Sequence, residues 1–199
     1  CYGFFHPQLV DEPLIFVEVA LTRAIPDNVG GLLDLARQPI RAEEADTAVF
    51  YSISNTQRGL AGVSFGNFLI KQVVEELKAE RPNIKTFVTL SPVPGFAAWL
   101  AAQRKDNSSD LISADQRLAF AALDRPGWQT DPATAEALRA PLLAAAATYF
   151  LRARSAAKRV IDPVARFHLG NGARLERLNH LGDVSANGIA QSHGLMVNY

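Results

Sequence analysis

Two apolar strands that flank one amphipathic helix, between residues 48 and 90, constrain the fold of this chain most strongly. AVFYSIS, residues 48–54, is rich in β-branched and aromatic residues and is predicted to be a strand. A glycine-bearing turn, TQRGLAGVSFG, follows it, and NFLIKQVVEELKAE then has the spacing of a helix with one apolar face. IKTFVTL, residues 84–90, is the next predicted strand. This order is a βαβ unit, so the two strands are expected to be parallel.

The segment before this unit adds a further strand. PLIFVEVALT, residues 13–22, is a nearly continuous β-branched and aromatic run, typical of a central strand covered on both faces. Asp27 or Asn28 is then expected to cap a short helix that runs through about Arg37. The predicted fold class is therefore α/β or α+β.

A block of helices separates the third strand from the polar end of the sequence. FAAWLAAQ, ADQRLAFAAL and TAEALRAPLLAAAATYFLRAR are predicted helices, which together make a helical insertion at about residues 97–158. Pro141 starts or kinks the last of these helices. With 199 residues, 48% of them hydrophobic, the chain can form one well-buried domain over residues 1–199.

Charge and cysteine content exclude several classes of protein. The chain carries 20 acidic and 20 basic residues, so it lacks the electrostatic footprint of a nucleic acid partner. No segment approaches the roughly 20 apolar residues that a membrane-spanning helix needs, so we expect no membrane partner. Cys1 is the single cysteine, which rules out an internal disulfide and favours a reducing compartment. No residues have metal-ligand spacing, and we expect no metal site.

The glycine turn TQRGLAGVSFG is a candidate anion site. A strand that enters a glycine turn and then a helix directs free backbone N–H groups at one point, where the helix dipole also favours negative charge. Gly59 and Gly62 allow a phosphate to approach the backbone, and Arg58 can add a charged contact. The spacing fits neither a Walker loop nor GxGxxG. An ordinary strand-to-helix connection is the alternative interpretation.

TLSPVPGF, residues 89–96, is a candidate site of a hydroxyl group. Two prolines fix the backbone just beyond the carboxyl end of a strand, the edge where open α/β sheets bind ligands. Ser91 is expected to lie there in a rigid, exposed position, with Thr89 on the same side. A rigid loop with an incidental hydroxyl is the alternative.

The stretch FHLGNGARLERLNHLGDVSA, residues 167–186, concentrates hydrogen-bonding side chains, His168 among them. Two glycines indicate a tight turn, after which a helix is predicted from about Ala173. The following SHGLMVNY, residues 192–199, reads as a buried edge strand or a loop, although its polar residues also allow a functional role.

Together these segments resemble the catalytic part of the malonyl-CoA decarboxylase family. The likeness follows YSISNTQRGLAGVSFGNFLIKQVVEEL, TFVTLSPVPGF and DPVARFHLGNGARLERLNHLGDVSANGIAQSHGLMVNY in order, and it weakens at residues 105–155. The resemblance implies an acetyltransferase (GNAT)-like fold, with a mixed central sheet flanked by helices. A splayed pair of strands in that sheet would admit the pantetheine arm of CoA.

The resemblance also implies the site residues. The family's active-site histidine corresponds to His168, and its catalytic hydroxyl to Ser91 or, as second choice, Thr89. A tyrosine of the family's NYxY region corresponds to Tyr199, and Asn171 is a substrate-binding candidate by its proximity to His168. The family's CoA-binding loop corresponds to Arg58, Gly59, Leu60, Ala61, Gly62, Val63 and Ser64.

The activity that the resemblance implies is conversion of malonyl-CoA to acetyl-CoA and CO2. No metal or organic cofactor is expected, since CoA is part of the substrate and the thioester accepts the electrons. His168 is the expected proton donor to C2, while Ser91 positions the malonyl carboxylate or bonds to His168. A CoA-dependent N-acyltransferase and a non-catalytic acyl-CoA sensor are the alternatives.

The resemblance bears on the parent protein as well. CYGFFHP lacks an initiator methionine and a signal peptide, so we expect a longer parent. The family carries an N-terminal helical domain used in oligomer contacts, which this chain lacks, so the full-length parent is expected to be a homo-oligomer. The expected location is cytoplasmic in a bacterium, and mitochondrial, peroxisomal or cytosolic in a eukaryote.

Overall fold

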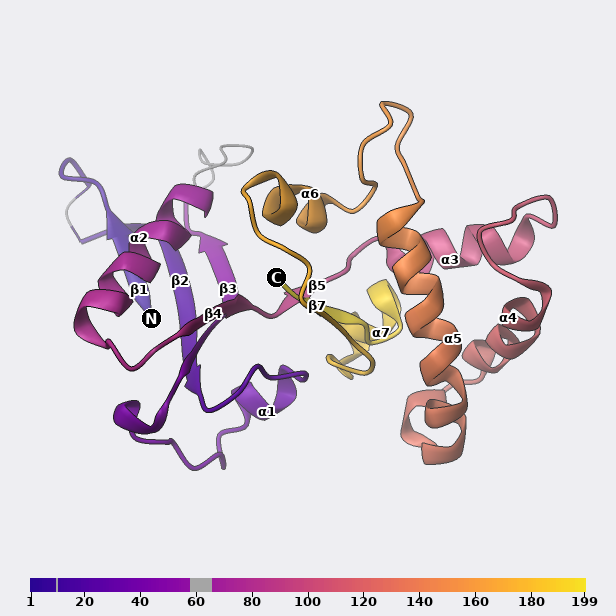
Figure 1. The fold of residues 1–199 in the computed structure, drawn as a ribbon, viewed down its shortest axis with the longest axis horizontal. Coiled ribbons are helices and arrows are strands. Elements are labelled where there is room, and N and C mark those ends of the chain that lie inside the picture. The colour runs from indigo at the N-terminus through magenta and orange to yellow at the C-terminus, as the bar shows by residue number, and fades with distance from the viewer. Residues whose placement is uncertain (10, 58–65) are drawn as a thin grey trace. The chain divides into compact units, whose positions relative to one another are not determined.

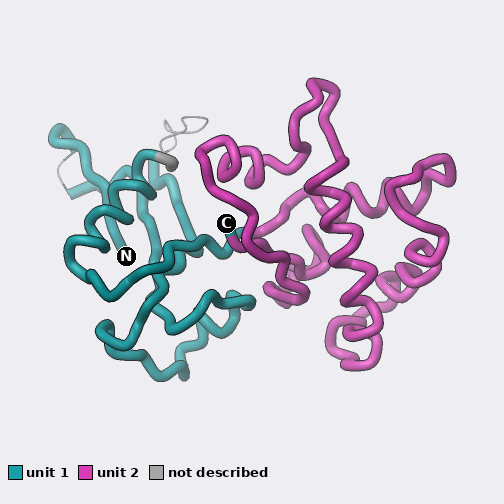
Figure 2. The backbone as a smooth tube through the Cα atoms, in the orientation of Figure 1, with its two compact units in different colours: residues 1–91, 199 teal, residues 92–198 magenta. Residues whose placement is uncertain are grey.

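The computed structural model describes residues 1–9, 11–57 and 66–199 (Figure 1). The chain divides into two compact units (Figure 2). The first comprises Cys1–Ser91 together with Tyr199, and the second comprises Pro92–Asn198. Within the described residues, every helix is too short or too polar to cross a membrane.

A four-stranded mixed sheet forms the centre of the first unit. It contains β1 (Tyr2–Phe5), β2 (Pro13–Thr22), β3 (Thr47–Asn55) and β4 (Thr86–Thr89), in that order. β1 and β3 run antiparallel to β2, whereas β4 runs parallel to β3. The predicted strand at residues 13–22 and the predicted parallel pair are thus confirmed. β1 was not predicted.

Helix α2 (Gly66–Glu80) covers one face of this sheet (Figure 1). Leu69, Val73 and Leu77 are buried and belong to the same apolar core as strand residues of the sheet. This i, i+4, i+8 stripe is the one that the sequence predicts. After the helix, the Asn83 side chain donates hydrogen bonds to two backbone carbonyls next to a short 3-10 helix, η1 (Ala42–Glu44).

Helix α1 (Gly30–Leu33) is shorter than the predicted helix, which extended to about Arg37. The N-cap residue is Val29, which makes no side-chain cap bond, and not Asp27 or Asn28 as expected, although Asn28 Oδ1 accepts a hydrogen bond from the Gly31 N–H at 3.0 Å. The helix buries none of its residues, so no packing stabilises further turns.

The second unit is mostly helical. Its helices are α3 (Phe96–Lys105), α4 (Ala114–Ala119), η3 (Phe120–Asp124), η4 (Trp128–Thr130), α5 (Pro132–Leu151), α6 (Pro163–Gly170) and α7 (Ala186–Ser192). α3 contacts both α5 and α7. Asp131 caps α5, and Pro141 lies inside that helix rather than at its start. The helices predicted between residues 97 and 158 are therefore present, and their description as an insertion stays a prediction.

Three short strands make a second sheet in the order β5 (Ser91–Pro92), β7 (Met196–Asn198) and β6 (Arg177–Asn179). β5 includes the boundary between the units, and β6 pairs antiparallel with β7. β7 is buried, as expected for the tail, but it is the middle strand and not an edge.

The helix predicted from about Ala173 is wrong. The chain reverses at Gly172, which has a φ of +87° that favours glycine, and then enters β6. The Glu176 N–H donates to the carbonyl of Asn198, and β6 continues this pairing with β7. A distant strand partner therefore overrides the local helical spacing of this segment.

Candidate functional site

Two of the predicted hydroxyl groups lie together at the end of β4. Thr89 is the last residue of β4 and Ser91 the first of β5, so strand alternation places both side chains on one side. The Ser91 hydroxyl donates a hydrogen bond to Thr89 Oγ1 at 2.9 Å. Ser91 is only 7% exposed, so the expectation of an exposed serine is wrong. Its hydroxyl is held by a buried partner instead.

Tyr199 joins the same cluster from the far end of the sequence. The Thr89 N–H donates to the Tyr199 carbonyl at 2.9 Å, and the Tyr199 N–H donates to Thr89 Oγ1 at 3.3 Å. Thr89 Oγ1 therefore accepts from both Ser91 and Tyr199. The structure thus brings three predicted residues into one hydrogen-bonded group, which we call the hydroxyl cluster (Thr89, Ser91 and Tyr199).

His168 lies in the last turn of α6, in the second unit. Pro163 occupies the first turn of this helix, where a missing N–H costs nothing, and Asp162 caps it. His168 is 9% exposed, and burial lowers the pKa of its imidazole from 6.5 to about 4. The ring meets that of Phe167 edge-on, with the ring centres 5.0 Å apart. His168 is therefore neutral at pH 7.

Asn171 follows α6 and contacts His168 through the backbone. Its N–H donates to the His168 carbonyl at 3.1 Å, as does the N–H of Ala173. These bonds close the carboxyl end of the helix. The contact between Asn171 and His168 is thus one of backbone atoms at the end of α6, and the role of Asn171 in the site stays a prediction.

The predicted site residues are divided between the two units and the residues outside the described part of the chain. The hydroxyl cluster belongs to the first unit, whereas His168 and Asn171 belong to the second. The predicted CoA-binding residues, Arg58 to Ser64, lie outside the described residues. In the part of the chain that is described, no group of three or more histidine, cysteine, aspartate and glutamate residues is arranged to hold a metal ion.

Several polar residues of the stretch 167–186 have structural roles. Asn179 is buried, and its amide donates to Asn198 Oδ1 at 2.8 Å while its own Oδ1 accepts from Arg177 at 2.7 Å. His180 Nε2 lies 3.0 Å from the carbonyl oxygen of Ala135, and burial lowers the pKa of this histidine. Buried polar groups need such partners, which explains much of the crowding.

Sequence reasoning missed two buried polar residues of the second unit, Tyr149 and Asp162. The Tyr149 hydroxyl donates to Asp162 Oδ2 at 3.3 Å. Neither position stands out locally, since the two residues belong to different predicted segments. The one available signal was an aspartate directly before Pro163, which is typical of a helix start.

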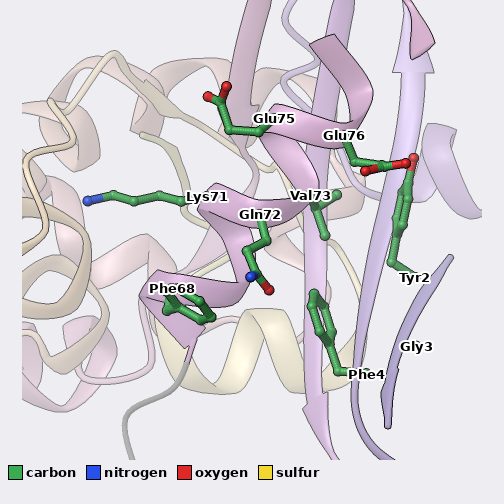
Figure 3. Close-up of a pocket in the computed structure, with 9 residues that line it drawn as sticks. All are labelled: Tyr2, Gly3, Phe4, Phe68, Lys71, Gln72, Val73, Glu75 and Glu76. Carbon is green, nitrogen blue, oxygen red and sulfur yellow. The ribbon is translucent and has the colours of Figure 1, made fainter. Parts of the chain in front are cut away.

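A pocket of about 720 Å³ lies in the first unit between β1 and α2 (Figure 3). None of the predicted site residues lines it. Lys71 points away from Tyr2 and Phe4, and Phe68 is largely exposed (Figure 3). The residues that line this pocket are Tyr2, Gly3, Phe4, Phe68, Lys71, Gln72, Val73, Glu75 and Glu76.

The fold is of the GNAT-like class. A solved GNAT-like decarboxylase in complex with isobutyryl-CoA matches 98% of this chain and 74% of its own chain, with a TM-score of 0.52 at 15% identity. At that identity the likeness concerns the fold alone. It confirms the predicted acetyltransferase-like architecture, with its mixed sheet and flanking helices.

A family model described as the malonyl-CoA decarboxylase C-terminal domain matches residues 1–199, and the chain belongs to this family. It is 38% identical over 219 residues to the mitochondrial malonyl-CoA decarboxylase of Anser anser anser, covering 100% of this chain and 43% of that protein. A crystal structure of malonyl-CoA decarboxylase from Rhodopseudomonas palustris is 66% identical, with a TM-score of 0.92 over 99% of this chain and 45% of that one. The corresponding structure from Agrobacterium vitis is 58% identical, with a TM-score of 0.94 over 99% of this chain and 48% of that one. The chain thus spans less than half the length of these relatives.

Proposed function

We propose that this chain is the catalytic part of a malonyl-CoA decarboxylase, a carboxy-lyase that converts malonyl-CoA to acetyl-CoA and CO2. The observation that carries this proposal is the 66% identity, over 99% of the chain, to a solved protein of that name. The names of further relatives, at 38% and 58% identity, support malonyl-CoA as the substrate.

The proposed reaction breaks the bond between C2 and a carboxylate that lies β to a thioester carbonyl. The electron pair moves into the thioester, which makes the transition state enolate-like, and CO2 departs. Catalysis then needs a donor for the thioester oxygen and a proton for C2. Loss of one such oxyanion donor typically costs about 2.7–4 kcal/mol. The thioester itself accepts the electrons, so the proposed mechanism uses no cofactor.

His168 is the proposed proton donor to C2. Its imidazole is neutral in the free protein because burial lowers its pKa to about 4. A negative charge close to a histidine favours the protonated form and raises its pKa. An anionic substrate bound beside His168 would therefore supply the condition under which the ring gains a proton, which it can then give to the enolate.

Ser91 is the proposed hydroxyl that positions the malonyl carboxylate, with Thr89 as its support. The Ser91 hydroxyl donates a hydrogen bond to Thr89 Oγ1 in the free protein. It must rotate about its Cα–Cβ or Cβ–Oγ bond to donate to a substrate, while Thr89 Oγ1 keeps the hydrogen bond from the Tyr199 N–H. Asn171 and Tyr199 remain candidates for substrate binding, since each is bonded to a proposed catalytic residue.

The loop from Arg58 to Ser64 is the proposed site of the CoA pyrophosphate. It precedes α2, a helix of 15 residues, whose N-terminal dipole favours anions. The substitution Gly62→Asp adds a negative charge to this loop and is expected to raise KM for malonyl-CoA with little change in kcat. Gly31→Asp adds the same charge in α1, at an open position, and serves as the control.

The activity itself is tested by mixing the full-length parent with malonyl-CoA and detecting acetyl-CoA by mass spectrometry. Conversion without an amine acceptor supports the decarboxylase. Turnover only with an amine would identify an N-acyltransferase, and binding without turnover a sensor. His168→Asn should lower kcat by at least about 10²-fold, the usual contribution of acid–base catalysis, with CoA binding intact. Near-normal turnover of this variant would remove His168 from the mechanism.

Homo-oligomeric assembly of the full-length parent and its location in the cell remain predictions. The relatives from Anser anser anser and Mus musculus are named as mitochondrial proteins. Sedimentation of the full-length parent would measure its oligomeric state, and imaging of a tagged parent would show its location in the cell.

A further inference from the structure

Gly95, in the turn PVPG that precedes α3, has an unusual requirement for space. A Cβ atom added at this position would lie 2.8 Å from the Tyr149 hydroxyl oxygen, closer than real Cβ contacts come. The φ of Gly95 is −100°, an angle that any residue adopts. The glycine is therefore required by the neighbouring hydroxyl and not by the backbone conformation.

The Tyr149 ring has no room to swing away from Gly95. It is 1% exposed and is enclosed by aromatic rings of its own unit. The ring centres of Trp99, Phe150 and Phe96 lie 5.2, 5.4 and 5.6 Å from that of Tyr149. This enclosure fixes the direction in which the hydroxyl points.

The hydroxyl of Tyr149 points at Asp162, the residue that caps α6. Asp162 is fully buried and uses both carboxyl oxygens: Oδ1 accepts from the Ala165 N–H at 2.8 Å, and Oδ2 accepts from Tyr149 at 3.3 Å. Burial raises the pKa of this carboxyl group. A helix cap at the surface needs neither burial nor a tyrosine partner, because water can satisfy the second oxygen.

We propose that Gly95, Tyr149 and Asp162 are positioning residues that fix α6 and thereby the direction of the His168 imidazole. The three contacts form one continuous path from the PVPG turn to the start of the helix that carries His168. This inference rests on the function proposed above for His168. It also gives a physical reason why a glycine ends the PVPG turn.

The first test is a double-substitution cycle at Gly95 and Tyr149. Gly95→Ala introduces the 2.8 Å contact, and we expect kcat to fall by up to about 10²-fold with KM unchanged, as for a 1 Å displacement of a reacting group. Adding Tyr149→Phe removes the hydroxyl, after which the nearest atom of that ring lies 3.9 Å from the Cβ, an ordinary contact. The double variant should therefore have the kcat of Tyr149→Phe alone, since both keep the ring and lack the hydroxyl bond to Asp162, and it should fold even if Gly95→Ala alone fails to fold.

The second test compares Asp162→Asn with Asp162→Ala. Asparagine keeps an acceptor for the Ala165 N–H and a polar partner for Tyr149, whereas alanine removes both. We expect Asp162→Ala to lower kcat by up to about 10²-fold. Asp162→Asn should keep most of the wild-type kcat, and KM should be unchanged in both variants.

The ¹⁵N resonances of the His168 imidazole provide a readout that does not depend on turnover. They should shift in Gly95→Ala and Asp162→Ala, return toward wild type in Asp162→Asn, and coincide in the double variant with those of Tyr149→Phe. A fall in kcat on adding Gly95→Ala to Tyr149→Phe that equals the fall on adding it to wild type, or unshifted His168 resonances in Asp162→Ala, would overturn the inference. Full turnover of His168→Asn would instead refute only the catalytic role of His168. The His168 resonances of the other variants would still show whether Gly95 and Asp162 fix the direction of the ring.

Discussion

Acidification from pH 7 to pH 5 is expected to lower the free energy of unfolding of the second unit by about 2 kcal/mol through His168 alone. In the folded unit, burial holds the pKa of His168 at about 4, against 6.5 for an ordinary histidine. At pH 5 the unfolded chain therefore binds a proton at this residue that the folded unit mostly does not bind. The stability that depends on the neutral ring is present above pH 6.5 and is lost as the pH falls toward 4.

The magnitude follows from the two pKa values. The full difference between 6.5 and about 4 corresponds to about 3 kcal/mol, at 1.36 kcal/mol for each pKa unit. About 2 kcal/mol of it falls between pH 7 and pH 5, because the folded histidine begins to bind a proton only near pH 4.

The assay is urea denaturation at pH 7, 6 and 5, followed by tryptophan fluorescence. Trp99 and Trp128 are the two tryptophans of the chain and both lie in the second unit, so the signal reports on the unit that contains His168. The substitution His168→Gln removes the titrating ring, and His6→Gln removes an exposed histidine as a control. Other buried histidines contribute equally to wild type and to these variants. An unchanged pH dependence in His168→Gln would refute the reasoning.

Three further substitutions test one hydrogen bond and two packing contacts of the chain. Thr89→Val removes the oxygen that accepts from Ser91 and should cost about 1–3 kcal/mol in the free energy of unfolding, measured by circular dichroism in urea. Gly188→Ala places a Cβ 2.4 Å from Asp183 Cγ and should cost about 1–3 kcal/mol, seen as a lower Tm. Leu100→Ala, at a residue with 0% exposure in α3, should cost about 2–5 kcal/mol by tryptophan fluorescence.

Each of these substitutions has a matched control. Thr89→Ser keeps the hydroxyl and should retain most of the stability that Thr89→Val loses. Gly31→Ala adds a methyl group where no atom lies within 4 Å, so it should not cause a clash. If Gly188→Ala proved as stable as Gly31→Ala, the predicted clash with Asp183 would be contradicted. Leu118 is 79% exposed, and Leu118→Ala should change stability by no more than about 0.5 kcal/mol.

The sequence predicted those elements whose signal is local. β2 lies at the predicted residues 13–22, and α2 buries the predicted stripe, because β-branched runs and 3.6-residue spacing are visible within a single segment. β6 and β1 were missed for the opposite reason. Each is four residues or fewer, and each is defined by a partner strand elsewhere in the sequence.

In the candidate site, too, the sequence predicted the features with a local signal and missed those that depend on distant residues. Strand alternation predicted that Thr89 and Ser91 share a side, and the 2.9 Å hydrogen bond between them confirms it. Their burial and their link to Tyr199 had no local signal, since Tyr199 lies 110 positions after Thr89 in the sequence. The Tyr149–Asp162 pair likewise joins two helical segments whose packing the sequence does not reveal.

The bond between Thr89 and Tyr199 has a consequence during synthesis on the ribosome. The two residues are 110 positions apart, so at about 5–20 residues per second Thr89 is made roughly 6–22 s before its partner. The whole second unit is translated within that interval. A nascent chain can therefore form the sheet of β1 to β4 early, but the oxygen that orients Ser91 gains its second donor only after translation has passed the helices. Chains released before that point would lack the hydrogen bond from Tyr199 to Thr89, even if their four-stranded sheet were fully formed.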